Sequence, residues 1–171
     1  DDLSTVTINE NLAMDVEQIA IGTFSPLTGF MNKKTLVSVL DTLRLPSGTI
    51  WPLPILLDVS EEDANKLKIG QKVLLGQKGD SPLAVLYLEE KFSFDSGVIA
   101  QKLYDTLSEE HPGVRYVRGL KPVFLAGKIE LLRRRAGEFS EYSLTPRQIR
   151  HLFVERGWST VVGFHTRNVI H

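Results

Sequence analysis

The sequence predicts an α+β protein built in two parts. Up to about residue 140, short apolar runs are separated by Gly and Pro, and only a few stretches have helical spacing. After Ser143 the pattern changes to a capped helix followed by a short β-branched run. A helix followed by a buried strand is typical of the beginning of a parallel α/β domain. We therefore predict a mostly β domain over residues 1–140 and the beginning of a second, α/β domain over residues 141–171.

The composition is that of an ordinary globular protein. The chain has 171 residues, of which 42% are hydrophobic and 24% charged, enough to bury one core and the start of a second. The net charge of −1 gives no overall attraction to nucleic acid or anionic lipid. The absence of cysteine excludes disulfide scaffolds, cysteine–zinc sites and cysteine nucleophiles. No apolar run approaches the roughly 18 residues that span a membrane, so we expect a cytoplasmic protein.

Three stretches of the first domain predict strands. Residues 51–59 are apolar but contain two prolines, which favours an edge or irregular strand because proline cannot donate to a β-ladder. Residues 71–90 predict a hairpin, with Gly79 and Asp80 in the turn. Residues 118–135 predict one or two further apolar runs around a central glycine.

Two stretches of the first domain predict amphipathic helices, residues 32–43 and residues 96–107. In each, apolar side chains recur at helical spacing and would face the core. These side chains are Leu36, Val39, Leu40 and Leu43 in the first helix and Ile99, Leu103, Tyr104 and Leu107 in the second.

The second domain begins with the clearest helix signal in the chain. Thr145 is a good N-cap, Pro146 suits the first helical position, and Gln148 completes a capping box. Gly157 would end the helix in the usual left-handed position. The apolar face would consist of Ile149, Leu152 and Phe153.

The run STVVGF, residues 159–164, predicts a strand buried on both faces, because it is β-branched and shows no alternation. Ligands of parallel α/β sheets bind beyond the carboxyl ends of the strands. A cluster of polar residues stands at that end of the run. It consists of His165, Thr166, Arg167 and Asn168, with His171 three residues further on.

These side chains suit a phosphate or sulfate group. The guanidinium of Arg167 offers a planar fork of donors, Thr166 and Asn168 add neutral donors, and His165 and His171 can carry a proton near neutral pH. The alternative is a polar loop without a ligand. No Asp or Glu follows Arg156, so this stretch offers neither a carboxylate base nor a cage for a hard metal ion, and we predict no metal ligands here.

The ending GFHTRNVIH, residues 163–171, resembles the signature of the ATP sulfurylase (sulfate adenylyltransferase) family, which typically runs Gln-Thr-Arg-Asn-x-x-His-x-x-His after a buried strand. Four upstream segments are similar to motifs of the same family, in the order seen here. They are DVEQIAIGTFSPLTGFM (15–31), WPLPILLDV (51–59), VFLAGKIE (123–130) and LTPRQIRHLFVERGW (144–158).

The resemblance implies a β-rich, PUA-like N-terminal domain followed by the start of a Rossmann-like nucleotidylyltransferase domain. It implies that ATP and sulfate react to give adenylyl sulfate and pyrophosphate. Mg²⁺ would accompany ATP without ligands from residues of this chain. It also implies a homo-oligomer at full length and no nucleic-acid partner.

The resemblance further implies roles for the residues of the ending. Thr166, Arg167 and Asn168 would be catalytic, His165 and Arg167 would bind sulfate, and His165, Asn168 and His171 would contact the ATP phosphates. His165 stands where the family usually has Gln. Both side chains can donate one hydrogen bond to sulfate, although a histidine would make sulfate binding depend on pH.

The ending departs from the family pattern, because the second histidine of the pair does not appear in the chain. We therefore expect a piece of a longer enzyme that is inactive alone. The competing hypothesis is a PUA-like module that binds RNA or another ligand without catalysis. The basic run at residues 132–138 could contact RNA or substrate, but the neutral overall charge favours a solvated strand end.

Overall fold

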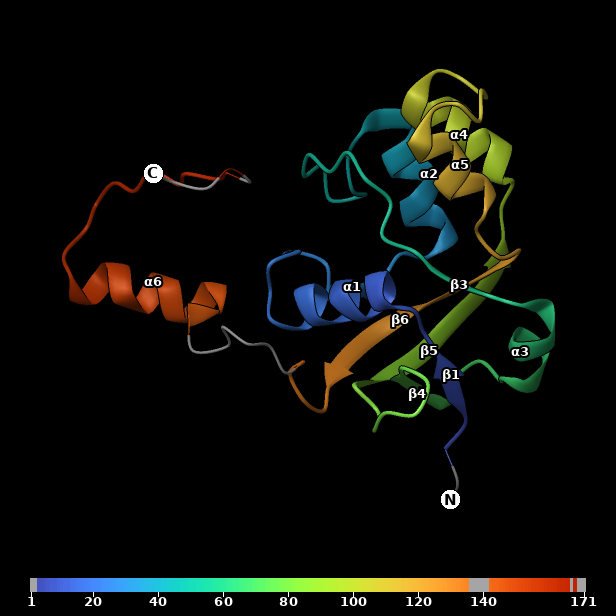
Figure 1. Cartoon of the computed structure of the whole chain (residues 1–171), viewed down its shortest axis with the longest axis horizontal. Helices are drawn as coiled ribbons and strands as arrows, with labels where there is room; N and C mark the ends of the chain where they lie inside the picture. Colours follow the sequence, from blue (N-terminus) through green and yellow to red (C-terminus); the bar gives the residue numbers. More distant parts are fainter. Residues whose placement is uncertain (1–2, 136–141, 167, 169–171) are drawn as a thin grey trace. The chain divides into compact units, whose positions relative to one another are not determined.

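The computed structural model describes residues 3–135, 142–166 and 168, and it divides into two units, residues 1–136 and 137–171 (Figure 1). The described part of the first unit is a mixed α/β structure with one sheet and five helices. Helices cover more of its residues than strands do, so the expectation of a mostly β, β-rich domain was wrong. In the parts of the chain that are described, none of the helices is long and apolar enough to cross a membrane.

The sheet of the first unit has six strands in the order β1-β4-β5-β6-β2, and β3 also pairs with β6. Only β1 and β4 run parallel, whereas the other pairs are antiparallel. The long strand β6 therefore joins three partners and organises the sheet (Figure 1). The strands are β1 (Thr5–Thr7), β2 (Gly29–Phe30), β3 (Leu57–Val59), β4 (Lys72–Gly76), β5 (Ala84–Ser93) and β6 (Val123–Leu131).

The predicted hairpin is confirmed. Strands β4 and β5 pair in antiparallel register, and between them Gly79 adopts a φ of +85° while the amide of Asp80 donates to the carbonyl of Gln77 over 3.1 Å. The prolines of residues 51–59 have the predicted effect as well. Both lie outside the three-residue strand β3, which pairs with β6 alone.

Three strands approach one another closely at Gly127, in the middle of β6. Gly127 lies between Leu88 of β5 and Phe30 of β2, and its φ is +151°. A Cβ atom at this position would lie 1.9 Å from the carbonyl oxygen of Tyr87. Directly beside it, the β5–β6 register shifts between Leu88 and Glu90, so Glu89 forms a β-bulge. Glycine is required here because no side chain fits between the strands.

Helix α1 (Glu10–Ala20) was not predicted. It begins at Asn9, whose side-chain oxygen accepts a hydrogen bond from the amide of Leu12 over 2.9 Å. Its apolar side chains face the sheet, where the helix lies against β6 (Figure 1). The buried apolar positions of the helix are Leu12, Ala13, Val16 and Ile19.

Helices α2 (Lys33–Thr42), α4 (Ser96–Tyr104) and α5 (Pro112–Arg118) form a second core at one end of the sheet (Figure 1). It includes Phe92 and Phe124, whose ring centroids lie 5.5 Å apart. The first two of these helices were predicted, but each ends before the last apolar residue assigned to it. Leu43 is the left-handed C-cap of α2 and is 51% exposed, while Leu107 lies beyond α4 and is 46% exposed.

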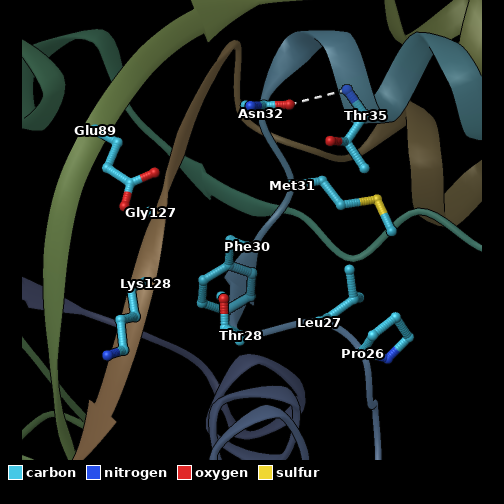
Figure 2. Close-up of a pocket in the computed structure, with 11 residues that line it drawn as sticks. Pro26, Leu27, Thr28, Phe30, Met31, Asn32, Thr35, Glu89, Gly127 and Lys128 are labelled. Atoms are coloured by element: carbon cyan, nitrogen blue, oxygen red, sulfur yellow. Dashed lines mark hydrogen bonds between the residues drawn. The ribbon is translucent and has the colours of Figure 1, made fainter. Parts of the chain in front are cut away.

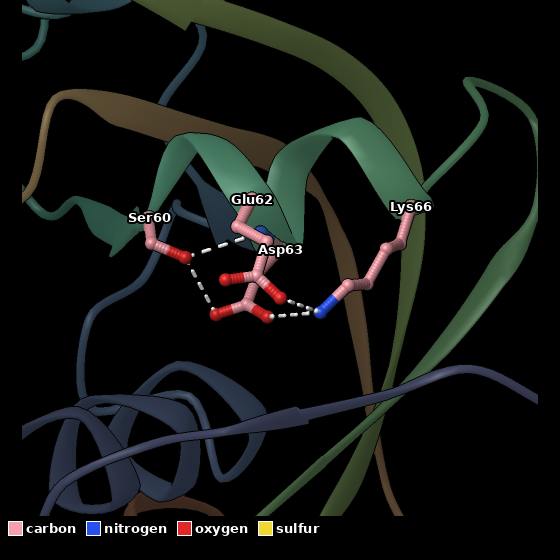
Figure 3. A network of polar contacts seen from close by, with 4 residues as sticks. All are labelled: Ser60, Glu62, Asp63 and Lys66. Atoms are coloured by element: carbon pink, nitrogen blue, oxygen red, sulfur yellow. Dashed lines mark hydrogen bonds and ion pairs between the residues drawn. The ribbon is translucent and has the colours of Figure 1, made fainter.

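The short helix α3 (Glu61–Lys66) is capped at both ends by side chains. Ser60 caps its N-terminus, and Lys66 pairs with Glu62 and Asp63 (Figure 3). The hydrogen bond from Ser60, reinforced by Lys66, lowers the pKa of Asp63 below its usual value. These groups are exposed, so the network contributes little to stability. At the other end, Lys91 donates to the carbonyls of Ala64 and Leu67, over 2.9 and 2.8 Å.

The described part of the basic run, residues 132–135, follows β6, and its arginines make contacts within the first unit. One of its arginines, Arg134, forms an ion pair with Glu17, whose side chain is only 9% exposed. This ion pair connects the segment after β6 with helix α1. Each of the three arginines of the run therefore has a partner within the first unit. Arg133 donates to the carbonyl of Ser81, Arg134 pairs with Glu17 over 2.9 Å, and Arg135 pairs with Glu10.

Replacing Arg134 by Ala is expected to lower the free energy of unfolding by about 2–3 kcal/mol, because the nearly buried carboxylate of Glu17 loses its ion-pair partner. Urea unfolding of the 171-residue chain measures the change. The matched control is Lys66→Ala, which removes an exposed pair and should change the free energy by less than about 1 kcal/mol. Equal effects of the two substitutions would contradict a structural role for the Arg134–Glu17 pair.

The second unit contains helix α6 (Pro146–Glu155), as predicted. Thr145 and Gln148 form the capping box, and Gly157 adopts the left-handed conformation with a φ of +65°. The strand predicted at residues 159–164 does not form, and Val162 and Phe164 are 93% and 83% exposed. A strand needs a neighbour for its backbone hydrogen bonds, and the described residues of this unit contain no other strand.

Candidate functional site

The predicted site residues follow α6 in the second unit. His165, Thr166 and Asn168 are described and lie on the surface, whereas Arg167 and His171 are outside the described residues. The amide of Asn168 donates to the hydroxyl oxygen of Thr166 over 3.0 Å. The structure thus brings Thr166 and Asn168 together in one turn. Anion binding by this segment stays a prediction.

The end of α6 gives this segment a defined start. The amide of Trp158 donates to the carbonyl of Phe153 over 2.9 Å, which closes the helix after Gly157. The indole of Trp158 packs beside the Phe153 ring and under the guanidinium of Arg156, whose central carbon lies 5.2 Å from the indole centre. The contacts among these three side chains stabilise the turn that precedes residues 159–166.

A polar hollow lies in the first unit, beside the family motif at residues 15–31. It has a volume of about 190 Å³ and is lined by residues of β5, β6 and the segment that leads into α2, with polar groups beside the apolar side chains of Leu27, Phe30 and Met31 (Figure 2). The side-chain oxygen of Asn32 is already used, since it accepts from the amide of Thr35 over 2.9 Å at the start of α2. Glu89, on the bulge, and Lys128 are exposed at its edge (Figure 2). The hollow is shallow, and its groups are those of an ordinary surface.

Among the described residues of the first unit, the most strongly perturbed carboxyl group is Asp15, on α1. Burial among apolar groups raises its pKa from the usual 3.8 to about 6. Burial, followed by the charges of Asp15 and Asp58, also raises the pKa of Tyr116. Asp15 was not among the predicted site residues. The available signal was a charged residue between Leu12 and Val16, two buried positions of the helix.

Replacing Asp15 by Asn is expected to stabilise the fold by about 1–2 kcal/mol at pH 7.5, after allowance for solvent access to this half-buried group. The folded protein holds the Asp15 proton more tightly than the unfolded chain, so wild-type stability falls as the pH rises from about 4 to 6. The stability of the Asp15→Asn variant should not fall over this pH range, because Asn does not ionise. Urea unfolding at pH 4, 5, 6 and 7.5 should show the difference growing across this window, whereas a pH-independent difference would contradict it.

Comparisons with known proteins match both units. Residues 1–134 match the PUA-like domain family, and residues 140–171 match the ATP-sulfurylase family. A sulfate adenylyltransferase of Synechococcus sp. (strain JA-3-3Ab) is 47% identical over 165 residues, which is 96% of this chain and 42% of that protein. A sulfate adenylyltransferase of Symbiobacterium thermophilum is 41% identical, covering 99% of this chain and 43% of that protein. The chain thus spans less than half the length of these relatives.

One solved structure shares the fold. The hexameric APS kinase from Thiobacillus denitrificans superposes with a TM-score of 0.67 over 92% of this chain and 27% of that one, at 24% sequence identity. At this identity the likeness concerns the fold alone. The assignment of the chain to a protein family therefore rests on the family matches and the relatives, and not on this structure. The chain belongs to the PUA-like domain family, and its residues 140–171 match the ATP-sulfurylase family.

Proposed function

We propose that the chain is part of a sulfate adenylyltransferase, which converts ATP and sulfate into adenylyl sulfate and pyrophosphate. The observation that carries this proposal is the 41–47% identity to sulfate adenylyltransferases over nearly the whole chain, together with the ATP-sulfurylase match over residues 140–171. In the whole protein, residues 159–164 would then form a strand of a Rossmann-like domain, paired with strands from outside this chain.

The reaction needs positioning and charge stabilisation and no covalent nucleophile from the protein. An oxygen of sulfate attacks the α-phosphorus of ATP, a new P–O bond forms, and the bond to the β-phosphate oxygen breaks to release pyrophosphate. Arg167 and His165 would hold sulfate in line with that bond. Thr166, Asn168 and His171 would donate hydrogen bonds to the phosphates, where negative charge grows as pyrophosphate leaves.

Mg²⁺ would enter with ATP and neutralise part of the phosphate charge. The described residues contain no group of three or more side chains that could hold a metal ion, so we propose that the phosphates supply ligands to the ion. We also propose a cytoplasmic enzyme that assembles from identical chains. Exposed apolar residues of the first unit, such as Leu43 and Ile50, offer surface for that assembly.

The test is sulfate-dependent release of pyrophosphate from ATP. The whole protein should show it, and the 171-residue chain alone should not, because the chain covers only 42–43% of its relatives. Absence of the activity in the whole protein would refute the proposal, and turnover by the chain alone would show that it holds a complete site. The alternative of an RNA-binding module predicts instead that the chain retains RNA on a filter, with an affinity that falls steeply as salt rises.

A further inference from the structure

The first unit contains a cavity that the proposed function does not use. Its volume of about 220 Å³ gives room for roughly seven water-sized groups. Ile99 and Val117, which are 1% and 4% exposed, close its floor. Leu53 and Tyr116, which are 57% and 53% exposed, lie at its rim. The cavity is therefore closed at one end and open to solvent at the other.

The walls are apolar except at one point. Segment 53–56 and helices α4 and α5 contribute apolar and tyrosine side chains, and α1 contributes Asp15. Asp15 is the only charged residue among the described residues that line the cavity. In the described parts of the chain, no hydrogen bond or ion pair joins its carboxylate to another residue. One negative charge thus stands in an apolar hollow without a hydrogen-bond or ion-pair partner among the described residues.

Two tyrosines add to the attraction for a cation, because the face of an aromatic ring carries negative potential. Tyr104 is held in place on one wall. Its ring centre lies 4.7 Å from that of His111, and a Cβ atom at Gly113 would lie 2.4 Å from its Cζ atom. His111 is itself fixed, because its Nδ1 accepts a hydrogen bond from the amide of Gly113 over 3.1 Å. The wall that Tyr104 forms is therefore preformed.

We propose that this cavity binds a small primary amine, with its ammonium group on Asp15 and its apolar body between Leu103 and Tyr104. An ammonium group supplies both the charge and the hydrogen-bond donors that the carboxylate lacks. A neutral apolar ligand would leave the carboxylate without a partner, and an anion would be repelled by it. A metal ion would find a single carboxylate, which is too few ligands. The site is independent of adenylyl transfer.

Benzylamine and benzyl alcohol are matched probes, because they have the same apolar body and differ in charge. Titration of the isotope-labelled 171-residue chain at pH 7.5, followed by NMR, should show amine-induced shifts at Leu103, Tyr104 and Tyr116. The amine is expected to bind at least tenfold more tightly than the alcohol. Equal affinities for the two probes, or shifts that map away from the cavity, would overturn the proposal.

Variants test the two halves of the site separately. Asp15→Asn keeps the shape of the side chain and should weaken benzylamine binding at least tenfold while leaving benzyl alcohol binding unchanged. Leu103→Trp should fill the cavity and abolish binding of both probes. Glu110→Gln, an exposed carboxylate outside the cavity, should change neither. Circular dichroism confirms that each variant is folded, and amine binding that survives in folded Asp15→Asn would refute the role of the carboxylate.

Discussion

Replacing Gly127 by Ala is expected to destabilise the chain by at least about 4 kcal/mol. The added methyl group would lie 1.9 Å from the carbonyl oxygen of Tyr87, which belongs to the backbone of β5 and cannot rotate away. The φ of +151° adds strain, because residues with a side chain rarely adopt it. The strand pairing between β5 and β6 would have to open at the bulge. Urea unfolding of the 171-residue chain measures the loss.

The control for this substitution is Gly79→Ala, in the turn of the β4–β5 hairpin. Gly79 also has a positive φ, of +85°, but no atom lies within 4 Å of the position where its Cβ would stand. Its replacement should therefore cost only about 1 kcal/mol of conformational strain. If the two substitutions differed by less than about 1 kcal/mol, the close approach of the strands at Gly127 would not be the cause.

In the whole protein, Arg167→Ala is expected to raise the KM for sulfate roughly 10- to 150-fold, the equivalent of a charged hydrogen bond of about 1.5–3 kcal/mol. On the proposed function, the guanidinium pairs with sulfate before the reaction begins, so its loss weakens binding in the ground state. Arg167→Lys should rescue poorly, because an ammonium cannot form the two parallel hydrogen bonds of a guanidinium. Steady-state kinetics with sulfate and ATP varied separately measure both variants.

His171→Ala is the matched comparison for Arg167→Ala, since it should lower kcat more than it raises the KM for sulfate. On the proposed function, His171 donates to phosphate oxygens whose charge grows only as pyrophosphate leaves, and such an interaction appears in kcat. If Arg167→Ala left both constants for sulfate within about twofold of wild type, the proposed roles of Arg167 and of its neighbour His165 would both be wrong.

Elements defined by local chemistry were predictable from the sequence. The capping box of α6 and the glycine turn of the β4–β5 hairpin depend on residues within a few positions of one another, and both formed as predicted. Helix α1 carried comparable signals, since Asn9 caps it and its apolar residues have helical spacing. Helix α1 was therefore predictable from local signals as well, although it was not predicted.

Elements that depend on distant partners were not predictable in the same way. The β-branched run at residues 159–164 has strand propensity, but propensity does not supply a neighbouring strand. Helix α2 ends one residue, and helix α4 three residues, before the last apolar position of its pattern, because Leu43 and Asp105 adopt left-handed conformations. The cavity at Asp15 is lined by residues from α1, α4, α5 and segment 53–56, which are far apart in the sequence. No local sequence pattern predicts that these residues lie together.

The central place of β6 has a consequence for how the first unit folds. Strands β2, β3 and β5 all pair with this last strand, and Arg134 joins Glu17 across 117 positions of sequence. Such a high contact order predicts slow folding, since long loops must close before these contacts can form. During synthesis on the ribosome, β2 and β3 cannot pair with β6 until residues 123–131 have emerged. The nascent chain therefore exposes unpaired strands for most of the translation of this unit, which is when it is most open to aggregation and to chaperones.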